Sequence, residues 1–115
     1  MVNRDELLRS HSRPLEGHAA MTPVQVQAQL AALPEWTQAD GAIGREFRFA
    51  DYFETIAFVN ALAFMVHRED HHPDLQVGYN RCGVRFNTHS VSGISLNDFI
   101  CAAKADAIFE QRSGA

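Results

Sequence analysis

Two pairs of short alternating segments, each joined by a tight-turn signal, constrain the fold of this chain most strongly. In the first pair, Asp40-Gly41 is a typical two-residue hairpin turn, and the run after it separates apolar from charged residues, although Arg45 interrupts the apolar face. The apolar face carries Ile43, Phe47 and Phe49, and the other face carries Glu46 and Arg48. In the second pair, Asn80-Arg81 is the turn. The strands on either side of it are predicted from Leu75, Val77, Tyr79, Val84, Phe86 and Thr88.

Three segments with helical periodicity flank these hairpins. The first begins with the capping box Thr22–Gln25, the second spans residues 51–70, and the third begins at Ser95 with Asp98 as the second half of its capping box. The apolar stripe of the second helix is predicted at Tyr52, Ile56, Val59, Ala63 and Val66, widened by Phe58, Leu62 and Met65. The order α-β-β-α-β-β-α predicts an α+β fold, a four-stranded antiparallel sheet with three helices packed on one face.

Length and charge limit the classes of protein that this chain can belong to. Its 115 residues suit one domain, which we expect over 22–112, after a flexible, loosely ordered leader over 1–21 that has no sustained periodicity. The net charge of −4 gives no electrostatic footprint for nucleic acid or an anionic membrane, and the longest apolar stretch, 55–66, is too short to span a bilayer. Two cysteines outside any C-x-x-C pair predict a cytoplasmic protein with reduced thiols.

Histidine is the residue type that points to chemistry. Of six histidines, four lie within 23 residues: His67, His71, His72 and His89. His72 lies where Pro73 ends the second helix, and His89 lies at the end of the fourth strand. A hairpin that starts beside the helix exit can return its far strand to the same place, so His71, His72 and His89 can surround one pocket. Imidazoles exchange protons near neutral pH, since their unperturbed pKa is about 6.5.

Two other interpretations of these histidines stay open on spacing alone. A histidine at the C-terminal end of a helix is often solvated and simply suits the helix dipole. A zinc site is the second alternative, with His67, His71 and His89 as ligands. The segment lacks an H-E-x-x-H pattern, and the adjacent Arg68 opposes a bound dication. Both features weigh against zinc, although spacing alone leaves the zinc alternative open.

The order and spacing of the motif residues resemble one family. The segment His67–Asp74, then Tyr79, Thr88-His89 and Asp98, is similar to the signature of pterin-4a-carbinolamine dehydratases, also known as the dimerization cofactor of a homeodomain transcription factor. Supporting features are Trp36, Phe47-Arg48-Phe49, Asp51-Tyr52-Phe53 and Gly93–Asp98. The resemblance covers roughly residues 22–112.

The resemblance implies an activity and a set of site residues. The implied reaction dehydrates 4a-hydroxytetrahydropterin to quinonoid dihydropterin in tetrahydrobiopterin recycling, without a metal or cofactor. His71, His72 and His89 would be the catalytic acid/base set, with His71 and His89 in the main proton transfers and His72 assisting. The implied substrate-binding positions are Trp36, His67, Pro73, Asp74, Tyr79, Thr88 and Asp98. For some of these a purely structural role competes, because Asp98 suits a capping box and the aromatics suit a core.

Two further expectations follow from the resemblance. Members form homodimers or homotetramers in which sheets join across subunits, which suits a small open sheet with edges to protect. The alternative function is a non-enzymatic, dimer-stabilising, coactivator-like module. One position departs from the family pattern: many relatives carry a carboxylate four residues before the first motif histidine, where this chain has His67. A histidine cannot supply that negative charge to His71.

Overall fold

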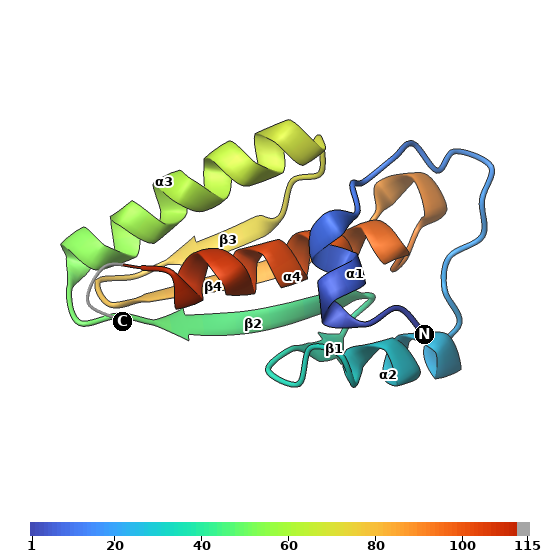
Figure 1. Ribbon diagram of the computed structural model, residues 1–115, viewed down its shortest axis with the longest axis horizontal. Helices are drawn as coiled ribbons and strands as arrows, with labels where there is room; N and C mark the ends of the chain where they lie inside the picture. The colour runs from blue at the N-terminus through green and yellow to red at the C-terminus, as the bar shows by residue number, and fades with distance from the viewer. Residues whose placement is uncertain (113–115) are drawn as a thin grey trace.

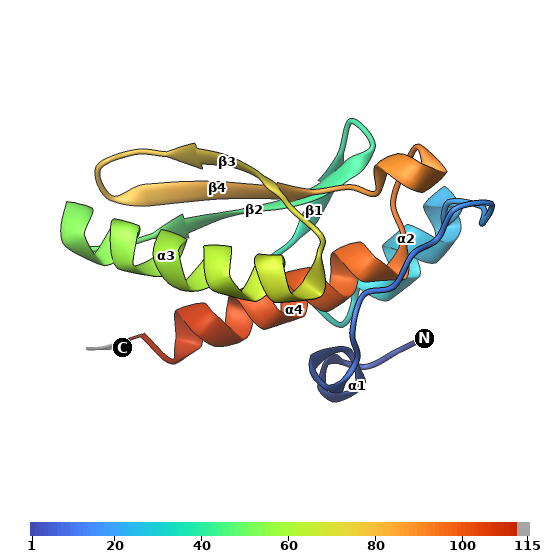
Figure 2. The ribbon, with the colours of Figure 1, turned by 90° about the horizontal axis from the view of Figure 1, so that it is seen from above.

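The structure of the protein is a computed structural model that describes residues 1–112, in which a four-stranded antiparallel sheet is covered on one face by two long helices (Figures 1 and 2). In chain order the elements are α1 (Arg4–Arg9), α2 (Pro23–Leu30), β1 (Thr37–Ala39), β2 (Ala42–Arg48), α3 (Tyr52–Glu69), β3 (Asp74–Val77), β4 (Arg81–Phe86), the 3₁₀ turn η1 (His89–Val91) and α4 (Leu96–Glu110). The predicted fold class is confirmed, with one short helix more than expected.

Both predicted hairpins form, and together they give the sheet order β1-β2-β4-β3. Asp40 and Gly41 have φ of 52° and 77°, which the twist of a two-residue hairpin requires. The central pair β2–β4 runs from Ile43↔Phe86 to Arg48↔Arg81. The second turn differs from the prediction, because the Gly78 N–H donates to the Arg81 carbonyl at 2.8 Å and ends β3 before Tyr79. Tyr79 therefore belongs to the turn.

Helices α3 and α4 lie side by side on the same face of the sheet, whereas α2 lies next to β1 at the side of the molecule (Figures 1 and 2). The capping boxes predicted at Thr22 and Ser95 both form. The predicted apolar stripe of α3 is only partly confirmed: Phe58, Leu62 and Val66 are buried as expected, but the other buried residues are Thr55 and Glu69. Tyr52 and Ala63 are exposed. Because α3 carries apolar residues on more than one side, its periodicity did not fix which side faces the core.

Arg45 interrupts the apolar face of β2 because it has a partner on α4. Its guanidinium lies 2.7 Å from the buried Asp106 carboxylate and 4.4 Å from the centre of the Phe47 ring. The Trp36 indole N–H donates to the same carboxylate oxygen at 2.9 Å. Burial raises the pKa of Asp106, although hydrogen bonds from Trp36 and the charge of Arg45 oppose this change. One buried carboxylate thus satisfies two donors inside the core.

The N-terminal segment differs from the flexible leader that the sequence predicted. Helix α1 begins with a capping box between Asn3 and Glu6, and Leu7 is fully buried in the core. Arg4 forms a 2.7 Å ion pair with Glu110, which ties α1 to the end of α4 (Figure 1). Asn3 and Glu6 have the spacing of a capping box in the sequence, but six helical residues are too few to show a periodicity, so this helix was not predicted. Over residues 1–112, no helix is long and apolar enough to cross a membrane.

Candidate active site

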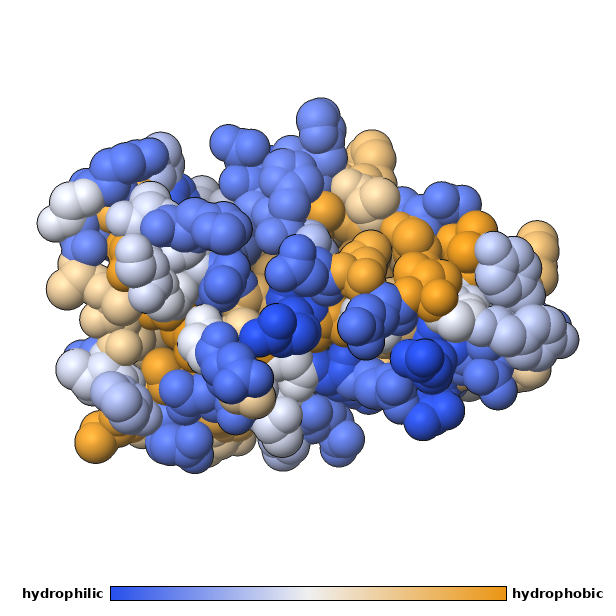
Figure 3. Space-filling model, turned by 180° about the vertical axis from the view of Figure 1, so that it is seen from behind, coloured by the Kyte–Doolittle hydropathy of each residue, from blue (hydrophilic) through white to orange (hydrophobic). Residues whose placement is uncertain are grey.

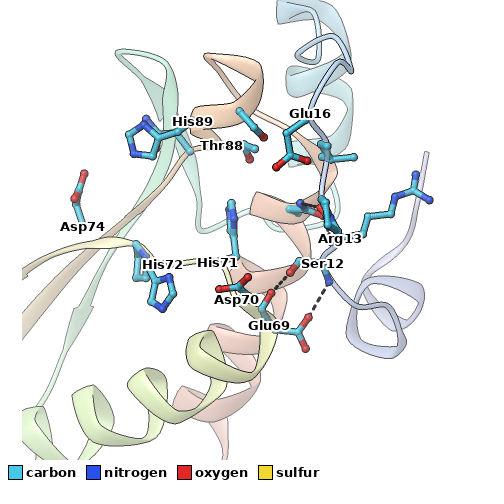
Figure 4. A pocket seen from close by; sticks show the side chains of 16 residues that line it. Ser12, Arg13, Glu16, Glu69, Asp70, His71, His72, Asp74, Thr88 and His89 are labelled. Atoms are coloured by element: carbon cyan, nitrogen blue, oxygen red, sulfur yellow. Dashed lines mark hydrogen bonds between the residues drawn. The ribbon is translucent and has the colours of Figure 1, made fainter.

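A cavity of about 480 Å³ opens at the end of the sheet where α3 stops and β4 continues into η1. Six residues that the sequence singled out line it: His71, His72, Pro73, Asp74, Thr88 and His89. They come from two segments, the α3–β3 connection and the exit of β4, which meet at the same edge (Figure 4). The β3–β4 hairpin brings them together, because β3 starts beside the helix exit and β4 returns to it.

The end of α3 sets the directions of the first two histidines. Asp70 caps the helix in the left-handed conformation with φ of 52°, and the His71 N–H donates to the Val66 carbonyl at 3.2 Å. Pro73 then prevents any further helical turn. His71 and His72 therefore project in different directions from consecutive positions (Figure 4).

The centre of the site is a contact between His71 and a fully buried carboxylate. His71 Nε2 lies 2.5 Å from Asp98 Oδ1, and the imidazole stacks on Phe86 with ring centres 6.0 Å apart. The second oxygen, Asp98 Oδ2, accepts from the Ser95 N–H at 2.9 Å and from the Thr88 hydroxyl at 3.0 Å. Asp98 is therefore both a capping residue of α4 and the partner of His71. With Nε2 held, Nδ1 is the His71 nitrogen that can exchange a proton with a ligand.

The other two cavity histidines are exposed. His72 follows His71 at the rim, and His89 begins η1, whose short turn is closed by the Ser92 N–H donating to the His89 carbonyl at 3.0 Å. The site thus combines one oriented, largely buried imidazole with two imidazoles that are exposed to solvent. Such a set can donate and accept protons on a ligand in the cavity.

Four predicted binding residues do not line the cavity. Asp98 lies behind His71, as described above. His67 is exposed on α3. Tyr79 is 65% exposed beyond the far end of β3, where it stacks on Tyr52, and Trp36 is a core residue that is 2% exposed. Among the described residues, no group of three or more histidine, cysteine or acidic side chains is placed to hold a metal ion, so His67, His71 and His89 do not form the alternative zinc site.

Sequence reasoning missed one wall of the cavity. Ser12–Glu16 line it, together with Glu69 and Asn97. Within this segment the only apolar aliphatic residue is Leu15, which is buried. Isolated residues without a period do not predict packing.

The α+β fold thus places a His–Asp pair beside a cavity at the edge of its sheet, an arrangement that can exchange protons with a bound ligand. One family model, described as pterin 4 alpha carbinolamine dehydratase, matches residues 19–108. A Bdellovibrio bacteriovorus protein that is provisionally named a pterin-4-alpha-carbinolamine dehydratase is 54% identical to this chain over 112 residues. The aligned region covers 94% of this chain and 92% of that protein. A similarly named protein of Xanthomonas campestris is 51% identical over 114 residues, covering 96% and 97% of the two chains.

A solved structure is similar as well. The crystal structure of a transcriptional coactivator/pterin dehydratase from Brucella melitensis superposes with a TM-score of 0.74 at 34% identity, covering 77% of this chain and 97% of that one. The chain belongs to the pterin-4-alpha-carbinolamine dehydratase family, and it is an enzyme of the hydro-lyase class.

Proposed function

We propose that this enzyme dehydrates 4a-hydroxytetrahydropterin to quinonoid dihydropterin by histidine acid/base catalysis, and that it acts in tetrahydrobiopterin recycling. The observation that carries the proposal is the His71–Asp98 contact of 2.5 Å at the wall of a cavity that two further histidines also line. Family membership supports a pterin substrate.

The chemistry needs two proton transfers. The hydroxyl leaves C4a as water, so its oxygen must receive a proton, and the ring nitrogen that forms the new C=N bond must lose one. His71 and His89 approach the cavity from different segments and carry these transfers, while His72 assists. Asp98 fixes the His71 ring and stabilises positive charge on it during the reaction. Each well-placed acid or base contributes about 10²–10⁴-fold in rate.

The test generates 4a-hydroxytetrahydropterin in situ and follows formation of the quinonoid product with and without catalytic amounts of protein. The His71→Ala and His89→Ala variants are expected to lose about 10²–10⁴-fold in rate, and His72→Ala far less. His18→Ala, an exposed histidine outside the cavity, is the matched control. Equal losses for all three cavity histidines would contradict the division of roles, and no acceleration by the folded wild type would overturn the activity.

A second copy of this chain is the proposed partner, in a homodimer or homotetramer. Edge strand β3 supports this proposal, because Leu75 and Val77 pair with the core residues Val84 and Cys82 yet remain 37% and 44% exposed. In Figure 3, which views the molecule from behind, hydrophobic surface gathers in the half of the molecule where α3 and β3 lie. Another strand added at this edge would satisfy its backbone groups and cover these side chains.

The non-enzymatic, dimer-stabilising role remains the second candidate, favoured by the similar Brucella melitensis protein, which is described as a transcriptional coactivator as well as a pterin dehydratase. A wild-type protein that is folded and oligomeric but inactive would support it.

For the cellular location we propose the cytoplasm. Cys82 and Cys101 are buried free thiols, and burial, with the nearby charges of Glu69 and Asp98, raises the pKa of Cys101 to about 12.

A further inference from the structure

The wall of the cavity formed by Ser12–Glu16, hereafter the strap, lies outside the part of the chain that the family model matches. That match begins at residue 19, yet all five strap residues line the same cavity as His71 and His89. The strap therefore adds a wall to the cavity that the motif residues do not supply.

Glu69 holds one end of the strap. Its Oε1 accepts from the Ser12 N–H at 2.8 Å, and its Oε2 lies 2.7 Å from Lys104 Nζ and 2.9 Å from His11 Nδ1. The Ser12 hydroxyl also donates to the Glu69 carbonyl. Burial alone would raise the pKa of Glu69, but the hydrogen bonds from Lys104, Ser12 and His11 lower it to about 2. The strap is thus tied to the last residue of α3, two positions before His71.

Asn97 holds the middle of the strap. The Arg13 N–H donates to Asn97 Oδ1 at 3.2 Å, and Asn97 Nδ2 donates to the Arg13 carbonyl at 2.7 Å, so one buried side chain binds both backbone groups of one residue. Leu15, which is also buried, fixes the next turn. Because Asn97 precedes Asp98 in α4, adjacent residues position the strap and the His71 imidazole relative to each other.

The strap brings one carboxylate into the cavity. Figure 4 shows the Glu16 side chain directed toward the cavity and the Arg13 guanidinium directed away from it. Asp98 and Glu69 already accept hydrogen bonds on both oxygens. Three other acidic residues of the cavity, Asp70, Asp74 and Glu16, make no side-chain hydrogen bond or ion pair with any residue that the structure describes, and the one supplied by the strap is Glu16. It lies across His71 from Asp74 and His72 (Figure 4).

The geometry points to Glu16 as a specificity-determining residue that binds the 2-amino group and N3–H of the pterin through its two carboxylate oxygens. This inference rests on the proposed function. The reacting atoms, C4a and its neighbouring ring nitrogen, must lie near the histidines, which leaves the pyrimidine edge to extend toward another wall. That edge presents two adjacent N–H donors, and a carboxylate is the side chain that accepts two parallel hydrogen bonds.

The test compares two competitive ligands that differ only at this edge. 7,8-Dihydropterin carries the 2-amino group, whereas 7,8-dihydrolumazine carries an oxygen there, which a carboxylate repels and an amide N–H₂ can bind. The wild type is expected to bind dihydropterin at least about tenfold more tightly, since one charge-assisted hydrogen bond contributes about that much. In Glu16→Gln this preference is expected to fall to near unity or to reverse, with KM for the hydroxylated substrate raised about tenfold and kcat within about twofold of wild type.

Glu35→Gln, an exposed acidic residue outside this cavity, is the matched control and should preserve both the preference and KM. A Glu16→Gln variant that behaves like Glu35→Gln, in a wild type that dehydrates the substrate, would overturn the role of Glu16 alone. If Asp74→Asn, and not Glu16→Gln, loses the preference for dihydropterin, the role of Glu16 is overturned as well, because the pyrimidine edge then lies on the opposite wall. A wild type that neither binds dihydropterin nor accelerates dehydration would instead overturn the proposed function.

Discussion

His71 Nε2 lies 2.5 Å from Asp98 Oδ1, and this contact joins the end of α3 to the first turn of α4 across 27 residues of sequence. The same carboxylate completes the capping box of α4 and accepts from Thr88 at the exit of β4. Three segments therefore depend on one buried negative charge. Substitutions at Asp98 should change both the orientation of the imidazole and the stability of the fold.

Asp98→Asn is expected to lower kcat by about tenfold or more, because the amide cannot accept from all three donors and carries no charge to balance a protonated imidazole. The variant should also unfold at a lower temperature, by about 4–8 °C for each kcal/mol lost. Steady-state kinetics and thermal unfolding measure the two effects. Thr88→Val removes one donor but keeps the charge, so its kcat should fall less. Equal losses of kcat in the two variants would show that the charge on Asp98 does not matter.

Glu69→Gln should destabilise the protein in a pH-dependent way. The folded pKa of Glu69 is about 2, below its ordinary value of 4.5, so its ionisation stabilises the fold above pH 4.5 and this contribution is lost as pH falls toward 2. At pH 7 the wild type should be more stable than Glu69→Gln by about 3 kcal/mol, since each pKa unit corresponds to about 1.4 kcal/mol. Urea unfolding at pH 7, 5 and 3 measures the difference, with Glu35→Gln as control. A difference that stays constant down to pH 3 would contradict the prediction.

Local signals predicted most of the fold. The Asp40-Gly41 turn and the capping boxes at Thr22 and Ser95 involve residues at most three apart, and each formed as expected. The buried side of α3 was predicted only in part, because several sides of this helix are apolar and only packing against the sheet selects one. Helix α1 was missed because, apart from the capping-box spacing of Asn3 and Glu6, its support comes from contacts with α4, which is distant in sequence.

The same distinction between local signals and contacts distant in sequence separates the histidines of the site from the strap. His71, His72 and His89 line one cavity because hairpin geometry returns β4 to the helix exit, which spacing can anticipate. The strap depends on the contacts of Glu69 and Asn97 with residues 57 and 84 positions earlier in the chain. No local sequence pattern encodes contacts between residues so far apart in the chain, so the strap could not be predicted from the sequence.

Arg45→Leu is expected to destabilise the protein by about 3 kcal/mol, because it leaves the Asp106 carboxylate buried without its cation. Arg45→Leu combined with Asp106→Asn removes the charge while keeping an oxygen that accepts from Trp36. The double variant should recover much of the loss. Urea unfolding of the three proteins measures the energies. A double variant less stable than Arg45→Leu would mean that the Asp106 charge itself is favourable without Arg45.

The exposed edge of β3 gives a prediction for assembly. Leu75 and Val77 lie on the core side of the sheet but extend beyond its helical cover, so a neighbouring copy that adds its own strand would bury them. The double variant Leu75→Lys, Val77→Lys should remain folded and shift from oligomer to monomer, because two buried lysines at such an edge would lack partners. Gln76→Lys adds charge to the same strand on the opposite face, and it should leave the oligomer intact. Sedimentation velocity measures the masses, and circular dichroism checks the fold. A wild type that is monomeric at high concentration, or a double variant that assembles like Gln76→Lys, would show that β3 is not the edge through which the subunits join.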